Sequence, residues 1–582
     1  MKKYCLDIDP DRYLLGELLG FMGNQEAEQP PVDPDAPYEP AHVGLFPRAL
    51  EVDGVERHIL TYIPPHFPTS GAGLFAFLDE GVSGAEFFAE GGWEERCTRM
   101  GVALILLEAA PSGWDREKIQ HEINFAQAAF RTAIARDLYS LNEATYYAAG
   151  YGAGAYPAAA FSLLFSSLFS GVVCDGDCAL HPDLLEQLAG LPSDGDRSIP
   201  KSRVKLPAWV IDRAGTAEPL LAYLKAANDV ADEGLHNGDA AVWRQDIRHP
   251  QAWINGLPLA EVWHSVEPVS YDKQLAFLLR VKRWMSGGDN NGDFRAARTP
   301  ADMGLRYFEK TCDGLKRHWY VYEPSAYRKN PGAKLPVVLA IHGYSCTGRL
   351  YAENAEWHTV AEKRGFFVIY PTAYPGCMGG ACTPLPLWNC DQFEGETGID
   401  DVGFLLSVIE DVKRAYPIDE GRVYCAGHSN GSAMTQLLME RAPGVFAAFG
   451  PVGYTFGEPA GGVAGKRRLI SPPADGLLRP VWLMKGEHDI GHAARLDEES
   501  CNTAFLRTMC AVNGCDPERV SGYENGAYRH LLYRDAQGAP LVRFTEIRDL
   551  PHAYSPEMAQ MTWDEFFCRF RRNTDGGIEY LG

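Results

Sequence analysis

The feature that most constrains the fold of this chain is a set of short motifs that occurs twice in the same order. Residues 93–101 and 357–365 share one spacing, a short helical pattern followed by glycine and a buried apolar run. Three more pairs match in the same order, at an offset of about 260–280 residues: 57–64 with 317–324, 142–150 with 419–427, and 207–211 with 480–484. Four ordered matches are not expected by chance, so the sequence predicts two homologous halves.

The length agrees with two domains. The 582 residues exceed the roughly 250–300 at which a single hydrophobic core stops growing. Hydrophobic residues make up 46% and charged residues 23%, which excludes a mainly disordered chain. The stretch 286–293 is rich in glycine, aspartate and asparagine and marks the expected join. We therefore expect one domain over residues 1–290 and a second over residues 291–582.

Apolar runs alternate with helical patterns in each half. In the second half we expect strands at 337–341, 366–370, 423–426, 481–484 and 541–547, and helices at 401–415, 432–441, 502–513 and 556–572. Continuous apolar strands alternating with helices indicate a mainly parallel sheet with helices on both faces. The predicted fold class is α/β, with two such domains in tandem.

Charge and hydropathy limit the partners. The chain has 77 acidic and 54 basic residues, a net charge of −23, which argues against nucleic acid or an anionic membrane surface as a partner. No stretch reaches about 18 uninterrupted apolar residues, so no membrane-spanning helix is expected. The first residues lack the continuous apolar core of a signal peptide, and fourteen cysteines are too few for a disulfide scaffold. We expect a cytoplasmic protein with mostly reduced thiols, and the sequence leaves a homodimer open.

A G-x-S-x-G motif at residues 427–431 follows an apolar strand pattern and precedes a helical pattern. This strand–turn–helix context is what a nucleophile elbow requires, and it predicts an α/β-hydrolase domain with Ser429 as the nucleophile. The two flanking glycines fit a strained turn that brings backbone close on each side. A glycine turn carrying a solvated serine is the alternative.

A serine nucleophile needs a base, and the base needs an orienting carboxylate. In α/β-hydrolases the acid and then the histidine follow the serine along the chain. Asp489, in the loop after the strand at 481–484, is favoured over Glu487 as the acid. His552, in the loop after the strand at 541–547, is the expected base. His488 and His492 are rivals that would break this chain order.

The oxyanion of a tetrahedral intermediate needs two hydrogen-bond donors. We expect the backbone N–H groups of Asn430, directly after the nucleophile, and of Tyr344, in the loop after the strand at 337–341. Gly343 would give this loop room to turn, and His342 is expected to support it. His428 and Trp388 are candidate contacts to the substrate.

Two other features favour structural roles. Asp400 and Asp401 open a helical pattern, where capping and helix-dipole roles are favoured over catalysis. Cys377, Cys382 and Cys390 cluster, but their spacing does not suit zinc and no histidine lies among them. No metal or cofactor is expected.

Residues 337–432 resemble the polyhydroxybutyrate depolymerase and feruloyl esterase group of α/β-hydrolases, known as carbohydrate esterase family 1. The resemblance is carried by His342-Gly343, Trp388-Asn389 and residues 400–404, 422–424 and 427–431. It implies a Ser429–His552–Asp489 triad and hydrolysis of a small ester with a feruloyl, other hydroxycinnamoyl, acetyl or hydroxyalkanoate group. A peptidase or acyltransferase using the same triad, or a binding or scaffold protein with a vestigial triad, remains an alternative.

The first half lacks the expected catalytic groups at the matching positions. Gly152 stands at the nucleophile position, Thr216 at that of the acid and Glu267 at that of the base, and the oxyanion strand ends Leu78-Asp79-Glu80. We expect a degenerate, inactive hydrolase-like domain that packs on the active one, mediates dimerisation or walls its pocket. Asp212 and His264 lie nearby and leave a rearranged site as the alternative.

Overall fold

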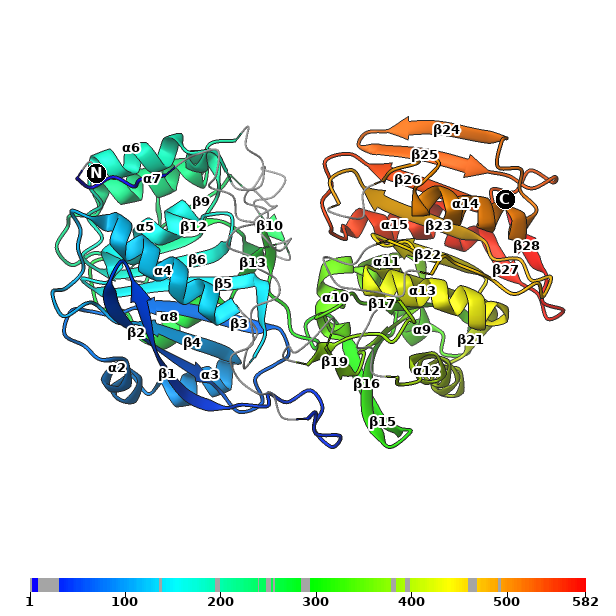
Figure 1. Ribbon diagram of the computed structural model, residues 1–582, viewed down its shortest axis with the longest axis horizontal. Helices are drawn as coiled ribbons and strands as arrows, with labels where there is room; N and C mark the ends of the chain where they lie inside the picture. The colour runs from blue at the N-terminus through cyan, green and yellow to red at the C-terminus, as the bar shows by residue number, and fades with distance from the viewer. Residues whose placement is uncertain are drawn as a thin grey trace. The chain divides into compact units, whose positions relative to one another are not determined.

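The computed structural model describes residues 3–8, 31–134, 139–193, 199–238, 240–246, 253–254, 257–283, 294–377, 384–392, 398–458, 468–489 and 494–582. The chain forms two compact units that separate between Ala297 and Arg298, with residues 31–38 belonging to the second unit (Figure 1). The join expected at residues 286–293 lies outside the described residues. Within the described part of the chain, no helix combines the length and apolarity needed to cross a bilayer.

The second unit is built on a ten-stranded sheet. Its strand order is β15(Leu305–Cys312), β16(Leu315–Tyr322), β18(Phe367–Pro371), β17(Leu335–Ile341), β21(Ile418–His428), β22(Ala448–Val452), β23(Val481–Gly486), β26(Val542–Ile547), β25(Tyr528–Tyr533) and β24(Val520–Asn525). Neighbours from β18 to β26 run parallel, and the outer strands at both edges are antiparallel. This arrangement confirms the predicted α/β class with a mainly parallel sheet.

Helices α10(Gly348–Ala355), α11(Trp357–Arg364), α12(Asp401–Ala415), α13(Asn430–Arg441), α14(Cys501–Asn513) and α15(Pro556–Glu565) accompany this sheet. The helix predicted at 556–572 is too long. It ends at Glu565, and β27(Phe570–Arg572) follows and pairs with β28(Ile578–Tyr580). The spacing of Phe566, Phe567 and Phe570 resembles a helical stripe, but these three rings are buried in the core after the helix has ended.

The first unit has a ten-stranded sheet with the same sequence of parallel and antiparallel neighbours. Its order is β1(Gly44–Val52), β2(Val55–Ile63), β4(Val102–Leu107), β3(Gly71–Phe77), β5(Leu141–Gly152), β6(Phe169–Gly176), β7(Ala208–Ile211), β12(Glu261–Ser265), β9(Ala240–Arg244) and β8(Leu235–Asn237). The inner strands from β4 to β12 are parallel. The outer pairs are antiparallel.

Alternate residues of β3 enter two different apolar clusters, which shows that both faces of the first sheet are covered. Phe75 and Phe77 pack in the cluster that contains α4(Ile119–Ile134) and α5(Ala155–Leu164). Leu74 and Ala76 pack in the cluster that contains α2(Gly84–Glu90), α3(Trp93–Met100) and α8(Tyr271–Leu278). Strands buried on both faces need continuous apolar sequence, as the runs of both halves have.

Each unit also contains its own buried side-chain network, of the same kind in both. In the second, Arg317 Nη2 lies 2.6 Å from Asp401 Oδ1 and the guanidinium stacks 3.8 Å from the ring of Phe404. In the first, Arg57, Glu122 and Phe125 make the corresponding contacts, at 2.9 Å and 3.9 Å. Asp400 caps α12 through the N–H of Gly403. Asp401 lies in the first turn of the helix, as a helix-dipole role requires, and also pairs with Arg317.

Candidate active site

Ser429 lies at the sharp turn between β21 and α13. Its backbone has φ 56° and ψ −119°, a conformation that costs of the order of 1–3 kcal/mol for a non-glycine residue. The flanking glycines leave no room for a side chain: a Cβ on Gly427 would lie 2.2 Å from the Gly431 carbonyl oxygen, and one on Gly431 would lie 2.3 Å from the Ile341 carbonyl oxygen. The turn thus has the local geometry of a nucleophile elbow.

The structure brings together the three residues that the chain order singled out. Ser429 Oγ lies 2.8 Å from His552 Nε2, and His552 Nδ1 lies 2.7 Å from Asp489 Oδ1. Asp489 is 2% exposed, whereas the His552 ring is partly open to solvent. A hydroxyl, an imidazole and a buried carboxylate in this series are the arrangement that activates a serine for attack on a carbonyl.

Backbone hydrogen bonds join the turn that carries Asp489 to the loop that carries His552. The N–H of Glu487 donates to the Ile547 carbonyl at 2.9 Å, and the N–H of His488 donates to the Leu550 carbonyl at 3.0 Å. Because β23 and β26 are parallel neighbours, both loops leave the same edge of the sheet. This pairing explains why residues 63 positions apart meet.

The rival residues point elsewhere or lie outside the described chain. His488 is exposed, with its Nε2 3.4 Å from Asp549 Oδ1, and Glu487 accepts the N–H of Asp549. Glu487, His488 and Asp549 also form a group close enough to share a cation. All three are exposed, and clusters of exposed acidic groups are common without a bound ion. His492 and Cys382 lie outside the described residues.

The loop after β17 lies close to Ser429. A Cβ on Gly343 would lie 3.2 Å from Ser429 Cβ, so the missing side chain lets the loop and Tyr344 approach closely. His342 supports the loop, as expected: its Nε2 accepts the N–H of Ala373 at 3.0 Å, which leaves Nδ1–H to donate to the Gly343 carbonyl at 2.6 Å. Burial lowers the pKa of His342 to about 3, so this imidazole is neutral.

Trp388 lies in the core rather than at a pocket surface. Its ring is 0% exposed, and its Nε1–H donates to the His342 carbonyl at 2.9 Å. Its backbone N–H donates to Asn430 Oδ1 at 2.8 Å. A fully buried ring has no surface to offer a substrate, so the substrate contact expected of Trp388 is replaced by support of the loop. The sequence could not show this, because the burial depends on where residues 384–392 fold back.

His428 is half-buried beside the triad. Its ring centroid lies 4.9 Å from that of His552, and a Cβ on Gly453 would lie 3.1 Å from the His428 ring. Sequence reasoning did not single out Gly453, because it missed β22, the strand directly before this glycine. The positive φ of +80° at Gly453 is visible only in the structure.

The matching turn of the first unit has the same positive φ angle, but a glycine and a neighbouring carboxylate replace the serine side chain. Gly152 has φ +56°, as Ser429 does, and Asp79 occupies the space in front of it. Asp79 Oδ1 accepts the N–H of Ala153 at 2.8 Å and that of Glu80 at 2.9 Å. These two N–H groups match those of Asn430 and Tyr344 in the second unit.

In the first unit, the residues at and near the expected acid and base positions do not form a serine–histidine–carboxylate series. The Asp212 carboxylate accepts N–H groups of Ala214, Gly215 and Ala217 at the start of α7(Glu218–Ala227). Its hydrogen bonds are therefore those of a local cap rather than of a catalytic acid. Thr216 and Glu267 are exposed.

Residues 323–468 match the protein family described as Esterase PHB depolymerase. The bifunctional acetylxylan esterase/xylanase XynS20E of Neocallimastix patriciarum is 31% identical over 142 residues, which are 24% of this chain and 18% of that protein. Poly(3-hydroxyalkanoate) depolymerase C of Paucimonas lemoignei is 24% identical over 237 residues, 38% of this chain and 55% of that protein. Both matches therefore span less than two thirds of the relative.

Acetylxylan esterase A of Aspergillus ficuum is 31% identical over 130 residues, 22% of this chain and 39% of that protein. Among solved structures, the acetyl xylan esterase from Aspergillus awamori aligns with a TM-score of 0.33 and 16% identity, covering 45% of this chain and 99% of that one. The matches in sequence confirm the predicted resemblance of the second half to the polyhydroxybutyrate depolymerase and feruloyl esterase group, and they add acetylxylan esterases to its relatives.

Proposed function

We propose that the protein is a serine carboxylic-ester hydrolase whose reaction centre is Ser429, His552 and Asp489. The observation that carries this proposal is the unbroken series of hydrogen bonds from the buried Asp489 carboxylate through His552 to the Ser429 hydroxyl. The strained elbow adds to it, because such strain is typical of residues held in place for a reaction.

The mechanism follows from the two hydrogen bonds of His552. Asp489 accepts Nδ1–H, which leaves Nε2 free of a proton and able to take the one on Ser429 Oγ. The oxygen then attacks the ester carbonyl, and the resulting oxyanion accepts the N–H groups of Asn430 and Tyr344. When the C–O bond to the alcohol breaks, Nε2–H gives its proton to the departing oxygen. Water repeats these steps to release the acid from the acyl-enzyme.

The arrangement of the first unit supports the two N–H groups assigned to the oxyanion. There the matching groups, on Ala153 and Glu80, converge on a single carboxylate oxygen of Asp79. Two donors that meet at one negatively charged oxygen are what an oxyanion hole requires.

The first unit is proposed to be an inactive copy of the second in a tandem repeat. The shared strand order and the shared Arg–carboxylate–aromatic network support the repeat. The absence of a serine at position 152 and the Asp79 carboxylate in front of that position support the loss of activity.

The substrate class is proposed to be small esters of acetyl, hydroxycinnamoyl or hydroxyalkanoate groups. The names of the matched relatives, acetylxylan esterases and a poly(3-hydroxyalkanoate) depolymerase, support the acetyl and hydroxyalkanoate groups. The hydroxycinnamoyl group rests on the resemblance of residues 337–432 to feruloyl esterases. A panel of aryl acetates, methyl ferulate and hydroxybutyrate oligomers distinguishes among these groups by their kcat/KM values.

A fluorophosphonate probe tests the reaction centre directly. We expect the protein to be labelled and to hydrolyse p-nitrophenyl acetate, and Ser429→Ala to lose both properties while its thermal unfolding stays unchanged. Ser521→Ala, which alters an exposed serine on β24, is the matched control and should keep both. A folded native protein that neither reacts with the probe nor cleaves any ester of the panel would overturn the proposal.

A further inference from the structure

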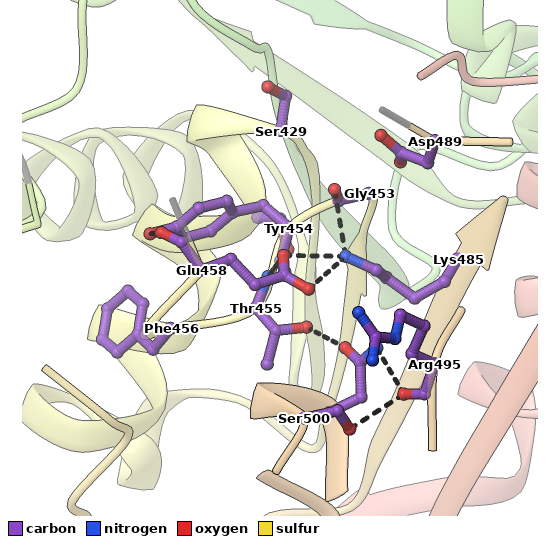
Figure 2. Close-up of polar contacts among 12 residues, drawn as sticks. Ser429, Gly453, Tyr454, Thr455, Phe456, Glu458, Lys485, Asp489, Arg495 and Ser500 are labelled. Atoms are coloured by element: carbon purple, nitrogen blue, oxygen red, sulfur yellow. Dashed lines mark hydrogen bonds and ion pairs between the residues drawn. The ribbon is translucent and has the colours of Figure 1, made fainter. Parts of the chain in front are cut away.

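A buried ion pair lies directly behind the reaction centre. Lys485 Nζ, near the end of β23, lies 2.9 Å and 2.8 Å from the two carboxylate oxygens of Glu458 (Figure 2). The Lys485 side chain is 0% exposed and that of Glu458 is 8% exposed. No step of the proposed mechanism uses either group.

Such a pair is not explained by stability alone. Taking two charges out of water costs several kcal/mol per ion, and apolar replacements of buried pairs are often neutral or stabilising. A role in holding neighbouring groups in one geometry would account for its presence at this place.

The ammonium also holds the turn that follows β22. Lys485 Nζ donates to the Gly453 carbonyl at 3.3 Å, and the Gly453 N–H donates to the Met484 carbonyl at 3.0 Å. Both polar groups of Gly453 are thus tied to consecutive residues of β23.

Glu458 closes the other end of the same turn. Its carboxylate accepts the N–H of Thr455 at 2.8 Å, and the Thr455 hydroxyl donates to Asn502 Oδ1 at 2.7 Å at the start of α14. The turn 453–458 is therefore anchored at both ends, and Lys485 contacts both anchors (Figure 2).

Gly453 is the point where this turn reaches the catalytic imidazole. A Cβ built on it would lie 3.4 Å from His552 Cε1, so the glycine backbone packs closely behind the ring. Its neighbour Val452 accepts the N–H of Ser429 at 2.9 Å. A shift of this turn would therefore move the nucleophile and the base relative to one another.

We infer that Lys485 is a positioning residue for the triad: through the Gly453 carbonyl and Glu458 it fixes the turn 453–458 against His552. The inference rests on the proposed function, since it concerns the same reaction centre. Lys485 touches neither the reacting atoms nor the substrate, and its effect is expected in kcat rather than in KM. A displacement of about 1 Å between reacting groups costs of the order of 100-fold in rate.

The test replaces the pair and compares it with a second ion pair, whose arginine is buried just before the other end of β23. Lys485→Met leaves Glu458 buried without its cation, so Lys485→Met/Glu458→Gln is made beside it; this double variant has no unpaired charge and keeps an acceptor for Thr455. Arg479→Met is the matched control, because Arg479 is 1% exposed, pairs with Asp475 at 2.6 Å, and precedes the other end of β23. Active-site titration with the fluorophosphonate normalises every rate to folded enzyme.

We expect the folded double variant to lose about 100-fold in kcat for p-nitrophenyl acetate, with KM within about twofold of the native value. Arg479→Met should keep kcat per titrated site even though it unfolds at lower temperature. A double variant that folds and keeps kcat within threefold of native would overturn the positioning role. An inactive native protein would instead contradict the proposed function, so the two failures are distinguishable.

Discussion

The two ring nitrogens of His552 have different neighbours, and this difference fixes where its proton lies. Asp489 Oδ1 is 2.7 Å from Nδ1, and Ser429 Oγ is 2.8 Å from Nε2. Asp489→Asn can present its NH₂ group to Nδ1 and so favour the wrong tautomer. We expect a loss of about 10⁴-fold in kcat for p-nitrophenyl acetate, with little change in the unfolding temperature. Glu487→Gln, in the same turn, should keep its activity; if it were the variant that lost activity, Asp489 would not be the acid.

A second residue-scale prediction concerns His530, which is buried on β25. Burial, aided by Arg543, lowers its pKa to about 4, against roughly 6.5 in an unfolded chain. Between these values the unfolded chain binds the proton and the folded one does not. The stabilisation is therefore complete above pH 6.5 and is lost as the pH falls towards 4, by about 1.4 kcal/mol per pH unit for one proton.

Denaturant unfolding at pH 7, 6 and 5 measures this effect. The free energy of unfolding should decrease as the pH is lowered. In His530→Gln its slope against pH should be smaller by the contribution of about one proton. Equal slopes for the variant and the native protein would show that His530 titrates alike in both states.

At the scale of elements, the turn from β21 into α13 reverses an ordinary rule. Replacing a helical glycine by alanine normally stabilises a protein by about 0.5–1 kcal/mol. At Gly431 the new Cβ would meet the Ile341 carbonyl oxygen at 2.3 Å, which is backbone and cannot move aside. We expect Gly431→Ala to lower the free energy of unfolding by about 1–3 kcal/mol and to abolish ester hydrolysis.

The matched control for this prediction is Gly190→Ala, at the end of α6(Pro182–Gly190), where nothing lies within 4 Å of the new atom. It should be neutral or stabilising. Denaturant unfolding of both variants provides the comparison, and a stabilised Gly431→Ala would contradict the close packing of the elbow.

Elements were predictable from sequence where burial on both faces makes a strand uniformly apolar, as in β17 and β23. The strand β22 was missed because Gly450 and Pro451 interrupt its apolar run. The hairpin of β24 and β25 was missed because it lies at the sheet edge, where six consecutive residues of β24 are exposed and polar sequence is tolerated.

The site was predictable to a similar degree. The order of Ser429, Asp489 and His552 follows from strand order in this fold, and the structure places them in hydrogen-bond contact. The contact of Asp79 with Ala153 and that of Lys485 with Glu458 join residues 74 and 27 positions apart, and no local pattern encodes them.

At the scale of the whole molecule, two sheets of the same strand order accompany a single proposed reaction centre. We expect intact-mass measurement after exhaustive fluorophosphonate treatment to show one adduct per chain, and Ser429→Ala to show none. The reason is that the first unit has Gly152 at the position that Ser429, the proposed nucleophile, occupies in the second. A second adduct, mapped by peptide analysis to residues 1–297, would contradict an inactive first unit.

The Asp79 carboxylate has a consequence for how the two units diverge over time. A serine introduced first at position 152 would place its Cβ 2.0 Å from Asp79 Cγ, and removal of Asp79 first would take the acceptor away from two backbone N–H groups. The first substitution therefore requires the Asp79 side chain to move, and the second leaves two N–H groups to find another acceptor. A serine side chain at this turn therefore needs a second change, at Asp79, as well as the substitution of Gly152.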